Sequence, residues 1–442
     1  MSDLTALRSL VRGRVLLDGD PGFEQARRPW NLAVRQPVPA VVEAAGTDDV
    51  VALVRYARAR GMSVSAQPSG HGATGEAAGG LDRVILLRTD RLDAVTVDPA
   101  ARLARVGAGA AWGRVQAAAE PHGLTGLPGS SPVVSVVGYT LGGGLSWFGR
   151  AYGWAADSVT AFDVVDADGL PARVTADSHA DLFWALRGGG GDFAVVTAVE
   201  FALHPAPALF GGRMLWPAEQ APHVLDAFRR ITADAPDELT VWADLLQFPS
   251  APPMVAVDAA YLGDAAAARA LLRPLDRIDL LISDSRAPMP VGDLGSITAE
   301  PTAPGPGRSR GELLTGLDDT AVKTLLAEPV DPLLSVQIRH LGGALARPSD
   351  SPHGPLTEPY ALYLFGIPST PAAAAAVQSR QRDLVRALAP YVSGRKPYTF
   401  LAPGETAAAA FAPHALARLR GVKRRHDPQG VIRSNFPVLG RR

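Results

Sequence analysis

The sequence of 442 residues contains no cysteine. This absence excludes disulfide bonds, thiolate nucleophiles, cysteine-ligated zinc and iron–sulfur clusters. The nine histidines are scattered along the chain, and none lies in an HExxH pattern. The sequence therefore gives little support for a metal site, and we expect none.

An excess of charge of either sign is also missing, as are long hydrophobic runs. The formal net charge is −1 and no basic stripe is present, so we do not expect a nucleic-acid partner. No apolar segment reaches the ~18 residues of a membrane span. The N-terminal residues MSDLTALRSLVRG lack the apolar core of a signal peptide, so we expect a cytoplasmic protein. The length predicts two or three domains, or a large domain with an insertion.

Glycine, in contrast, is abundant, and three glycine-rich loops stand out. The central stretch, residues 126–153, carries Gly142-Gly143-Gly144 after an apolar segment, and the other two loops are residues 68–72 and 188–191. Glycine lets backbone N–H groups approach a bulky ligand because no Cβ is in the way. Three such loops, each beside a strand-like run, favour a cradle for a large anionic cofactor. The alternative is that all three are tight turns.

The first half of the chain reads as short strands with few helices. Thr47 is expected to cap a helix that Gly61 ends. The segment Gly107-Ala108-Gly109 is not a nucleotide fingerprint, because Gly113 stands one residue too late for GxGxxG. Asp168-Gly169 predicts a hairpin turn. Strands are expected at residues 62–66, 84–87, 94–97, 102–106, 158–165, 172–175 and 193–201, and helices at 108–120 and 178–187.

Composition changes at about residue 206. Helices are predicted at residues 217–232, 265–275, 371–389 and 411–425, and strands at 213–216, 239–248, 254–262, 334–340 and 360–365. This pattern is typical of an α+β layer with one antiparallel sheet and helices on one side. Residues 284–310 are rich in Pro, Gly and Ser and are expected to form a loop or lid. Asn435 has apolar flanks, which favour a buried polar contact over an ordinary turn position.

Four ordered motifs resemble one family: QPSGHG, GSSPVVSVVGYTLGGG, DLFWALRGGGGDFAVVT and VKRRHDP…VIRSNFPV. They resemble the berberine bridge enzyme-like FAD-linked oxidases of the vanillyl-alcohol oxidase (PCMH-type) superfamily. The resemblance is close over residues 30–205 and the last 30 residues, and looser between them. It implies an α+β fold: a two-part PCMH-type FAD-binding domain of residues 1–205 and 405–442. The substrate domain, residues 206–404, is inserted between the two parts as an antiparallel sheet covered by helices.

The resemblance also implies how FAD is held. His71 would be bonded to the flavin, and this link would be single, because Ser131 stands where many relatives have a second, cysteine link. Val134 would face the reactive flavin edge, as in oxygen-reactive members, although a valine of a core strand fits equally well. Tyr139 stands where many relatives have a histidine near the flavin pyrimidine, with a packing role as the alternative. The implied cofactor contacts are Ser69, Gly70, His71, Gly72, Ser130, Ser131, Val134, Tyr139, Gly142, Gly143, Gly191, Val196 and Asn435.

The implied activity is an FAD-dependent oxidase that moves a hydride from a small organic substrate to flavin N5, with dioxygen reoxidising the flavin. Family members often carry Tyr-x-Asn-Tyr/Phe beside the site, but here Phe400 and Leu401 replace the last two residues. The more apolar wall favours a hydrophobic, secondary-metabolite-like substrate over a sugar. The candidates for the catalytic base or hydrogen-bond donor, each with packing as the alternative, are Tyr398, Tyr139, Tyr360, Tyr363 and Gln337.

Two other functions stay open at this point. One is a flavin dehydrogenase that avoids oxygen, and the other is a flavin-binding protein without turnover. The expected partners are the small-molecule substrate and dioxygen, and the chain is expected to be a monomer or a homodimer.

Overall fold

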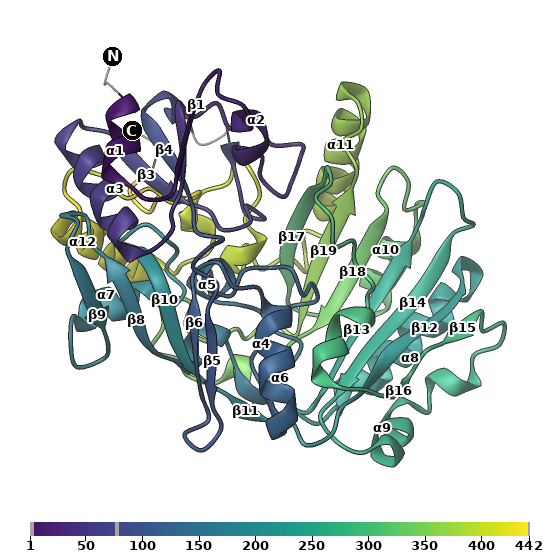
Figure 1. The fold of residues 1–442 in the computed structure, drawn as a ribbon. Helices are drawn as coiled ribbons and strands as arrows, with labels where there is room; N and C mark the ends of the chain where they lie inside the picture. The colour runs from purple at the N-terminus through teal and green to yellow at the C-terminus, as the bar shows by residue number, and fades with distance from the viewer. Residues whose placement is uncertain (1–3, 76–78, 441–442) are drawn as a thin grey trace.

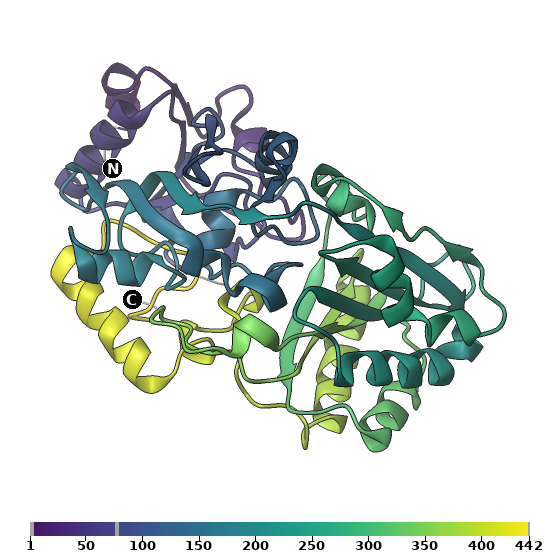
Figure 2. The same cartoon turned by 90° about the horizontal axis from the view of Figure 1, so that it is seen from below.

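The structure, a computed structural model, describes residues 4–75 and 79–440. It has two halves that lie side by side, one built on two small sheets and the other on one large sheet (Figure 1). The last helix returns to the N-terminal half, where it lies beside the small sheets (Figure 2). Within the described residues, no helix is both long enough and apolar enough to cross a lipid bilayer.

The N-terminal half contains a four-stranded sheet and a five-stranded sheet. In the first, β2 and β3 both run parallel to β4, while β1 is antiparallel to β2. The second is antiparallel throughout, as the Asp168-Gly169 turn predicted for β8 and β9. In spatial order the strands are β1 (Arg14–Leu17), β2 (Ala40–Glu43), β4 (Val84–Arg88) and β3 (Ser63–Ala66), then β5 (Val95–Asp98), β6 (Leu103–Gly107), β10 (Val195–Ala202), β8 (Val159–Val165) and β9 (Pro171–Val174). A small separate pair is β7 (Leu124–Thr125) with β11 (His204–Pro205).

The other half is one antiparallel sheet, as predicted from its pattern of strands and helices. Its strands follow the order β15 (Ser283–Asp284), β12 (Phe210–Pro217), β14 (Met254–Tyr261), β13 (Leu239–Leu246), β18 (Ser335–His340), β19 (Tyr360–Gly366) and β17 (Arg308–Leu314), with β16 (Ala287–Pro288) also on β12. One face packs its alternate residues against α8 (Ala221–Ala233), α9 (Ala265–Leu272), α10 (Asp319–Leu326) and α11 (Pro371–Ala387). The opposite face is turned toward the N-terminal half, because Trp242 packs there with Leu127 and Trp147.

The remaining helices belong to the N-terminal half or link the halves. They are α1 (Leu7–Leu10), α2 (Phe23–Ala26), α3 (Thr47–Ala59), α4 (Trp112–Ala119), α5 (Val136–Leu141), α6 (Gly149–Tyr152), α7 (Ala180–Leu186) and α12 (Pro413–His426). Leu182, Phe183 and Leu186 of α7 are buried, as predicted.

Three local predictions were wrong. Thr47 does not cap α3: Gly46 holds the cap position, and the Asp49 carboxylate accepts hydrogen bonds from the backbone of Arg12 and Gly13 instead. Residues 108–111 are not helical, because α4 begins at Trp112. The apolar run before Gly142 is a helix rather than strand-like, because the Ser135 hydroxyl caps it by accepting from the Gly138 N–H.

Candidate functional site

The first glycine loop, residues 68–72, follows β3 and contains His71. Its imidazole stacks on Trp30 with ring centroids 4.3 Å apart, and Nδ1 lies 2.7 Å from the Ser69 hydroxyl. The other ring nitrogen, Nε2, is buried and has no hydrogen-bond partner within the described residues. Burial lowers the pKa of His71 to about 4, so the ring is neutral at pH 7. A neutral imidazole with an unpartnered nitrogen is suited to bonding an electrophilic carbon.

Two exposed glycines, Gly72 in the first glycine loop and Gly138 beside Pro68 of that loop, would accept a Cβ without a clash. A Cβ added at Gly72 would have Asn435 Nδ2, 3.9 Å away, as its nearest neighbour, and one at Gly138 would meet nothing nearer than 3.9 Å. Gly70 differs, because its φ of +74° and its contact with Pro29 make it a turn residue. Gly72 and Gly138 therefore leave room for a ligand to approach the main chain, and this fits the FAD predicted for the site.

Tyr139 extends from α5 toward the eight-stranded sheet. Its ring meets Trp112 edge-on, with centroids 5.6 Å apart, and its hydroxyl is buried without a partner in the described chain. Burial raises the pKa of Tyr139, while the positive charge of Arg339 acts in the opposite direction. The phenol stays protonated at neutral pH and is available as a hydrogen-bond donor.

The segment before α5 also contains predicted contact residues. Val134 is half-buried, and its backbone carbonyl accepts a hydrogen bond of 3.0 Å from the Trp112 N–H. Ser130 is half-buried as well, whereas Ser131 is buried. Val196 is buried within β10. Val134, Val196 and Tyr139 belong to the same apolar cluster.

The second glycine loop is residues 142–144 and the third is residues 188–191. Both make room for protein side chains. A Cβ at Gly142 would lie 3.2 Å from the Tyr398 ring, and one at Gly190 would lie 2.5 Å from the Tyr398 hydroxyl oxygen. A Cβ at Gly143 would lie 2.4 Å from His353 Nε2. Gly191 is less crowded, with Leu141 3.7 Å from a Cβ built there. The two loops thus enclose the Tyr398 ring, whose pKa is raised by burial.

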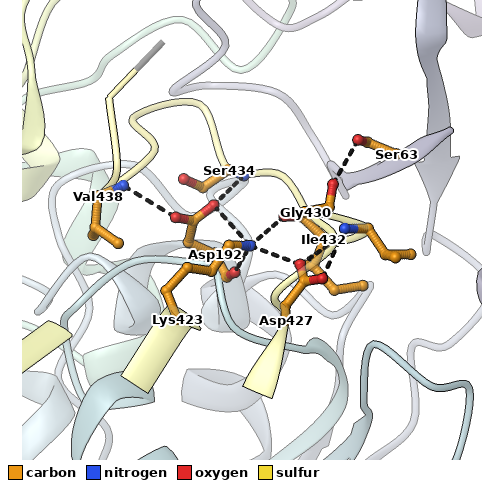
Figure 3. A network of polar contacts seen from close by, with 9 residues as sticks. Ser63, Asp192, Lys423, Asp427, Gly430, Ile432, Ser434 and Val438 are labelled. Atoms are coloured by element: carbon orange, nitrogen blue, oxygen red, sulfur yellow. Dashed lines mark hydrogen bonds and ion pairs between the residues drawn. The ribbon is translucent and has the colours of Figure 1, made fainter. Parts of the chain in front are cut away.

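A buried lysine ties the C-terminal segment to the third glycine loop (Figure 3). Lys423 Nζ on α12 donates to the Asp427 carboxylate at 2.8 Å and to the backbone carbonyls of Asp192 and Ile432. The Asp192 carboxylate accepts from the backbone N–H groups of Ser434 and Val438. This network fixes the chain on both sides of Asn435.

Asn435 forms polar contacts, as the sequence predicted, although the residue is half-buried rather than buried. Its side-chain oxygen accepts a hydrogen bond of 3.2 Å from Gln67 Nε2, at the start of the first glycine loop. Its backbone carbonyl accepts one of 3.1 Å from the Thr74 hydroxyl. Residues from the two ends of the sequence therefore meet beside Gly72.

The candidates on the eight-stranded sheet separate into two faces. Gln337 and Tyr363 are direct cross-strand partners on β18 and β19. Tyr360 lies on the other face, where its hydroxyl is 2.7 Å from the Thr232 hydroxyl and its ring packs near Phe228. Tyr360 is therefore on the helix-covered side, away from the N-terminal half.

Sequence reasoning missed a row of charged residues on the face that carries Gln337. Arg213 forms a two-point ion pair with Asp258, at 2.6 and 2.8 Å. Asp244 accepts from the Ser335 hydroxyl at 2.6 Å and from Gln337 Nε2 at 3.3 Å. Burial raises the pKa of Asp244 to about 7. The signal was present in the alternation of Ser335, Gln337 and Arg339 with Val336 and Ile338, which puts the polar residues of β18 on one face.

Comparisons with known proteins agree with this arrangement. Residues 38–175 match the model of a family described as an FAD binding domain. Over 99% of both chains, the sequence is 26% identical to (R)-6-hydroxynicotine oxidase of Paenarthrobacter nicotinovorans. It is 34% identical to glucooligosaccharide oxidase of Sarocladium strictum over 42% of this chain and 38% of that protein. The solved structure of Physcomitrella patens BBE-like 1 superposes with a TM-score of 0.86 and 18% identity, over 98% of each chain.

The matched FAD-binding segment contains His71, Gly72 and Gly138, the residues around which the described chain leaves room for a ligand. The likeness to the solved structure extends over both halves. The chain is thus an FAD-linked oxidoreductase with the fold of the berberine bridge enzyme-like proteins.

Proposed function

We propose that the chain is an oxidase that carries FAD on a single covalent link through His71 and uses dioxygen as the electron acceptor. The bound FAD would supply hydride acceptance from a substrate carbon. Residues 1–205 and 405–442 would hold the cofactor, and residues 206–404 would bind a small, largely apolar substrate. The observation that carries this proposal is the neutral His71 imidazole, whose Nε2 is buried and unpartnered in the described chain. It lies next to exposed Gly72, where an added Cβ would meet nothing nearer than 3.9 Å.

The chain's own residues would divide the remaining tasks. Tyr139 and Tyr363, both with a pKa raised by burial, would donate hydrogen bonds rather than accept protons. Asp244 would hold a proton near neutral pH, in contact with Gln337. Tyr398, between the second and third glycine loops, would contact the cofactor side of the site.

The proposal is tested by Gly72→Ala, with Gly316→Ala as the matched control. Both positions accept a Cβ in the folded chain, since the nearest atom is 3.9 Å away at Gly72 and none lies within 4 Å at Gly316. We expect both variants to keep the Tm of the flavin-free protein. Only Gly72→Ala should reduce the visible absorbance of bound flavin. Equal flavin content in wild type and both variants would show that the main chain at Gly72 does not approach the cofactor.

The choice between oxidase and oxygen-avoiding dehydrogenase rests on a second measurement. Val134 is half-buried beside Tyr139, which supports access of a small molecule to this edge of the site. We expect rapid recovery of the flavin spectrum when reduced enzyme is mixed with air-saturated buffer. Persistence of the reduced spectrum in air would favour the dehydrogenase.

A further inference from the structure

Arg339 carries a positive charge that the protein leaves without a carboxylate partner. On the sheet face that carries Trp242, the neighbouring cation Arg213 is neutralised by Asp258. Arg339 Nε donates to Gln337 Oε1 at 2.6 Å. Among the described residues, no carboxylate lies within 4.0 Å of its guanidinium, and no hydrogen bond joins its two terminal nitrogens to protein.

Three aromatic rings surround this guanidinium instead. Its central carbon lies 4.0 Å from the ring centroid of Trp242, 5.1 Å from that of Tyr363 and 5.4 Å from that of Phe400. Such contacts stabilise the cation through the faces of the rings. They do not satisfy the in-plane N–H groups, which form a fork that matches a carboxylate.

Acids of the described chain act on Arg339 only through space, without contacting its guanidinium. Asp244 is the nearest acid along the hydrogen-bonded chain through Gln337, and burial keeps it largely protonated up to about pH 7. Glu300 acts on Arg339 through space, but it does not form an ion pair with it. Burial lowers the pKa of Arg339, which reflects the lost hydration of its charge.

The position of Arg339 connects this charge to the proposed reaction site. It lies close enough to Tyr139, on the cofactor-binding side, for each to affect the other's ionisation. It also contacts Phe400, which replaces the asparagine expected from the family resemblance. A ligand placed here would meet apolar rings along its body and a guanidinium at one end.

We propose that Arg339 is the receptor for a carboxylate on the substrate, which makes the substrate an organic acid with an apolar or aromatic body. This inference rests on the proposed function, since it takes the sheet face beside Tyr139 as the substrate side of the site. Arg339 is then a specificity-determining residue, and Trp242, Tyr363 and Phe400 orient its charge.

The test compares benzoate with its neutral isostere benzamide. Binding to the flavin-loaded protein is followed by the flavin spectrum and by calorimetry, for wild type, Arg339→Gln, Arg339→Lys and the exposed control Arg382→Gln. We expect wild type and Arg382→Gln to prefer benzoate by about ten- to hundredfold, as for a charge-assisted hydrogen-bonded pair. Arg339→Gln should lose the preference, and Arg339→Lys should keep only part of it.

Failure of this inference is separable from failure of the proposed function. A colourless protein that takes up no FAD would overturn the proposed function, but benzoate binding by that same protein, followed by calorimetry, would still test Arg339. If wild type shows equal or no affinity for the two probes, the inference is overturned. It is also overturned if Arg339→Gln keeps the preference for benzoate. Should Arg339→Gln fail to fold, Arg339→Lys decides: a preference for benzoate weaker than that of wild type supports the inference, and an unchanged preference overturns it.

Discussion

The indole rings of Trp147 and Trp242 stack with their centroids 3.6 Å apart and an angle of 12° between their planes. Trp147 follows the second glycine loop, and Trp242 lies on β13 of the eight-stranded sheet. Both side chains are buried, at 0% and 3% exposure. The stack joins the proposed cofactor side to the proposed substrate side. Trp242 also packs against the Arg339 guanidinium.

This stack predicts energetic coupling between the two halves. Trp147→Ala and Trp242→Ala should each destabilise the protein by roughly 3–5 kcal/mol, as large truncations of buried rings do. In a double-mutant cycle by chemical denaturation, the pair should show a coupling energy of about 0.5–1.5 kcal/mol. Trp184 belongs to a different core cluster, so Trp147→Ala combined with Trp184→Ala should be additive. Additivity of the stacked pair would contradict the prediction.

Replacement of His71 should release the flavin from the chain. We expect His71→Ala to lose the yellow colour that stays with acid-precipitated wild-type protein, because no other side-chain nitrogen in the first glycine loop is buried and unpartnered among the described residues. The exposed His122→Ala serves as the control and should keep its colour. Colour in precipitated His71→Ala protein would place the link elsewhere.

Asp244 should make stability depend on pH. Burial raises the pKa of Asp244 to about 7 in the folded chain, whereas the carboxyl has a pKa of about 4 in the unfolded chain. Between about pH 4 and 7 the folded state therefore keeps a proton that the unfolded state has already released. Its contribution to the free energy of unfolding is therefore greatest below pH 4 and falls as pH rises, by up to about 1.4 kcal/mol per unit. Asp244→Asn should remove this part of the slope.

The measurement is denaturant unfolding at pH 5 and pH 7 for wild type, Asp244→Asn and the exposed control Asp279→Asn. The difference between variants cancels the opposing effect of buried histidines such as His340, whose lowered pKa, about 3, weakens the fold as pH falls. Parallel slopes for wild type and Asp244→Asn would mean that Asp244 ionises normally.

Loss of the buried lysine should loosen the C-terminal segment. Lys423→Met leaves the carboxylate of Asp427, which is fully buried, without its cation, and we expect destabilisation by about 3–5 kcal/mol. Hydrogen exchange should rise at Ser434 and Val438, whose N–H groups are held by Asp192 (Figure 3). The exposed Lys323→Met should change stability little. Unchanged protection at Ser434 would show that Lys423 does not hold Asp192 in place.

Sequence patterns predicted the elements whose signal is local. β13, β14 and β18 were predicted as strands of one antiparallel sheet with helices on one side. In the structure, every second residue of these strands packs against those helices. β17 was missed, since Arg308, Ser309, Arg310 and Gly311 form a polar start to an edge strand and resemble the loop before it. α5 was misread because its short apolar run suits either structure, and only the Ser135 cap decides.

The candidate site was predictable on one side only. The motif around His71 predicts a cofactor loop, and this stays a prediction. Gln337 and Tyr363 were predicted as separate candidates, and their cross-strand pairing appears only in the structure. The isolation of Arg339 could not be read from the sequence. The absence of a carboxylate partner depends on which acids lie on the neighbouring strands. Asp258 forms its ion pair with Arg213 because β12 and β14 place these two residues directly opposite each other.

The loop between β18 and β19 crosses back to the other half, where the buried His353 ring stacks on Trp154 and fills the space beside Gly143 and Gly188. A shortened protein made only of the N-terminal half would therefore lose the side chain that covers two of its glycine loops. The inserted half completes the walls of its neighbour, so the two halves should be produced as one polypeptide and not as separable modules.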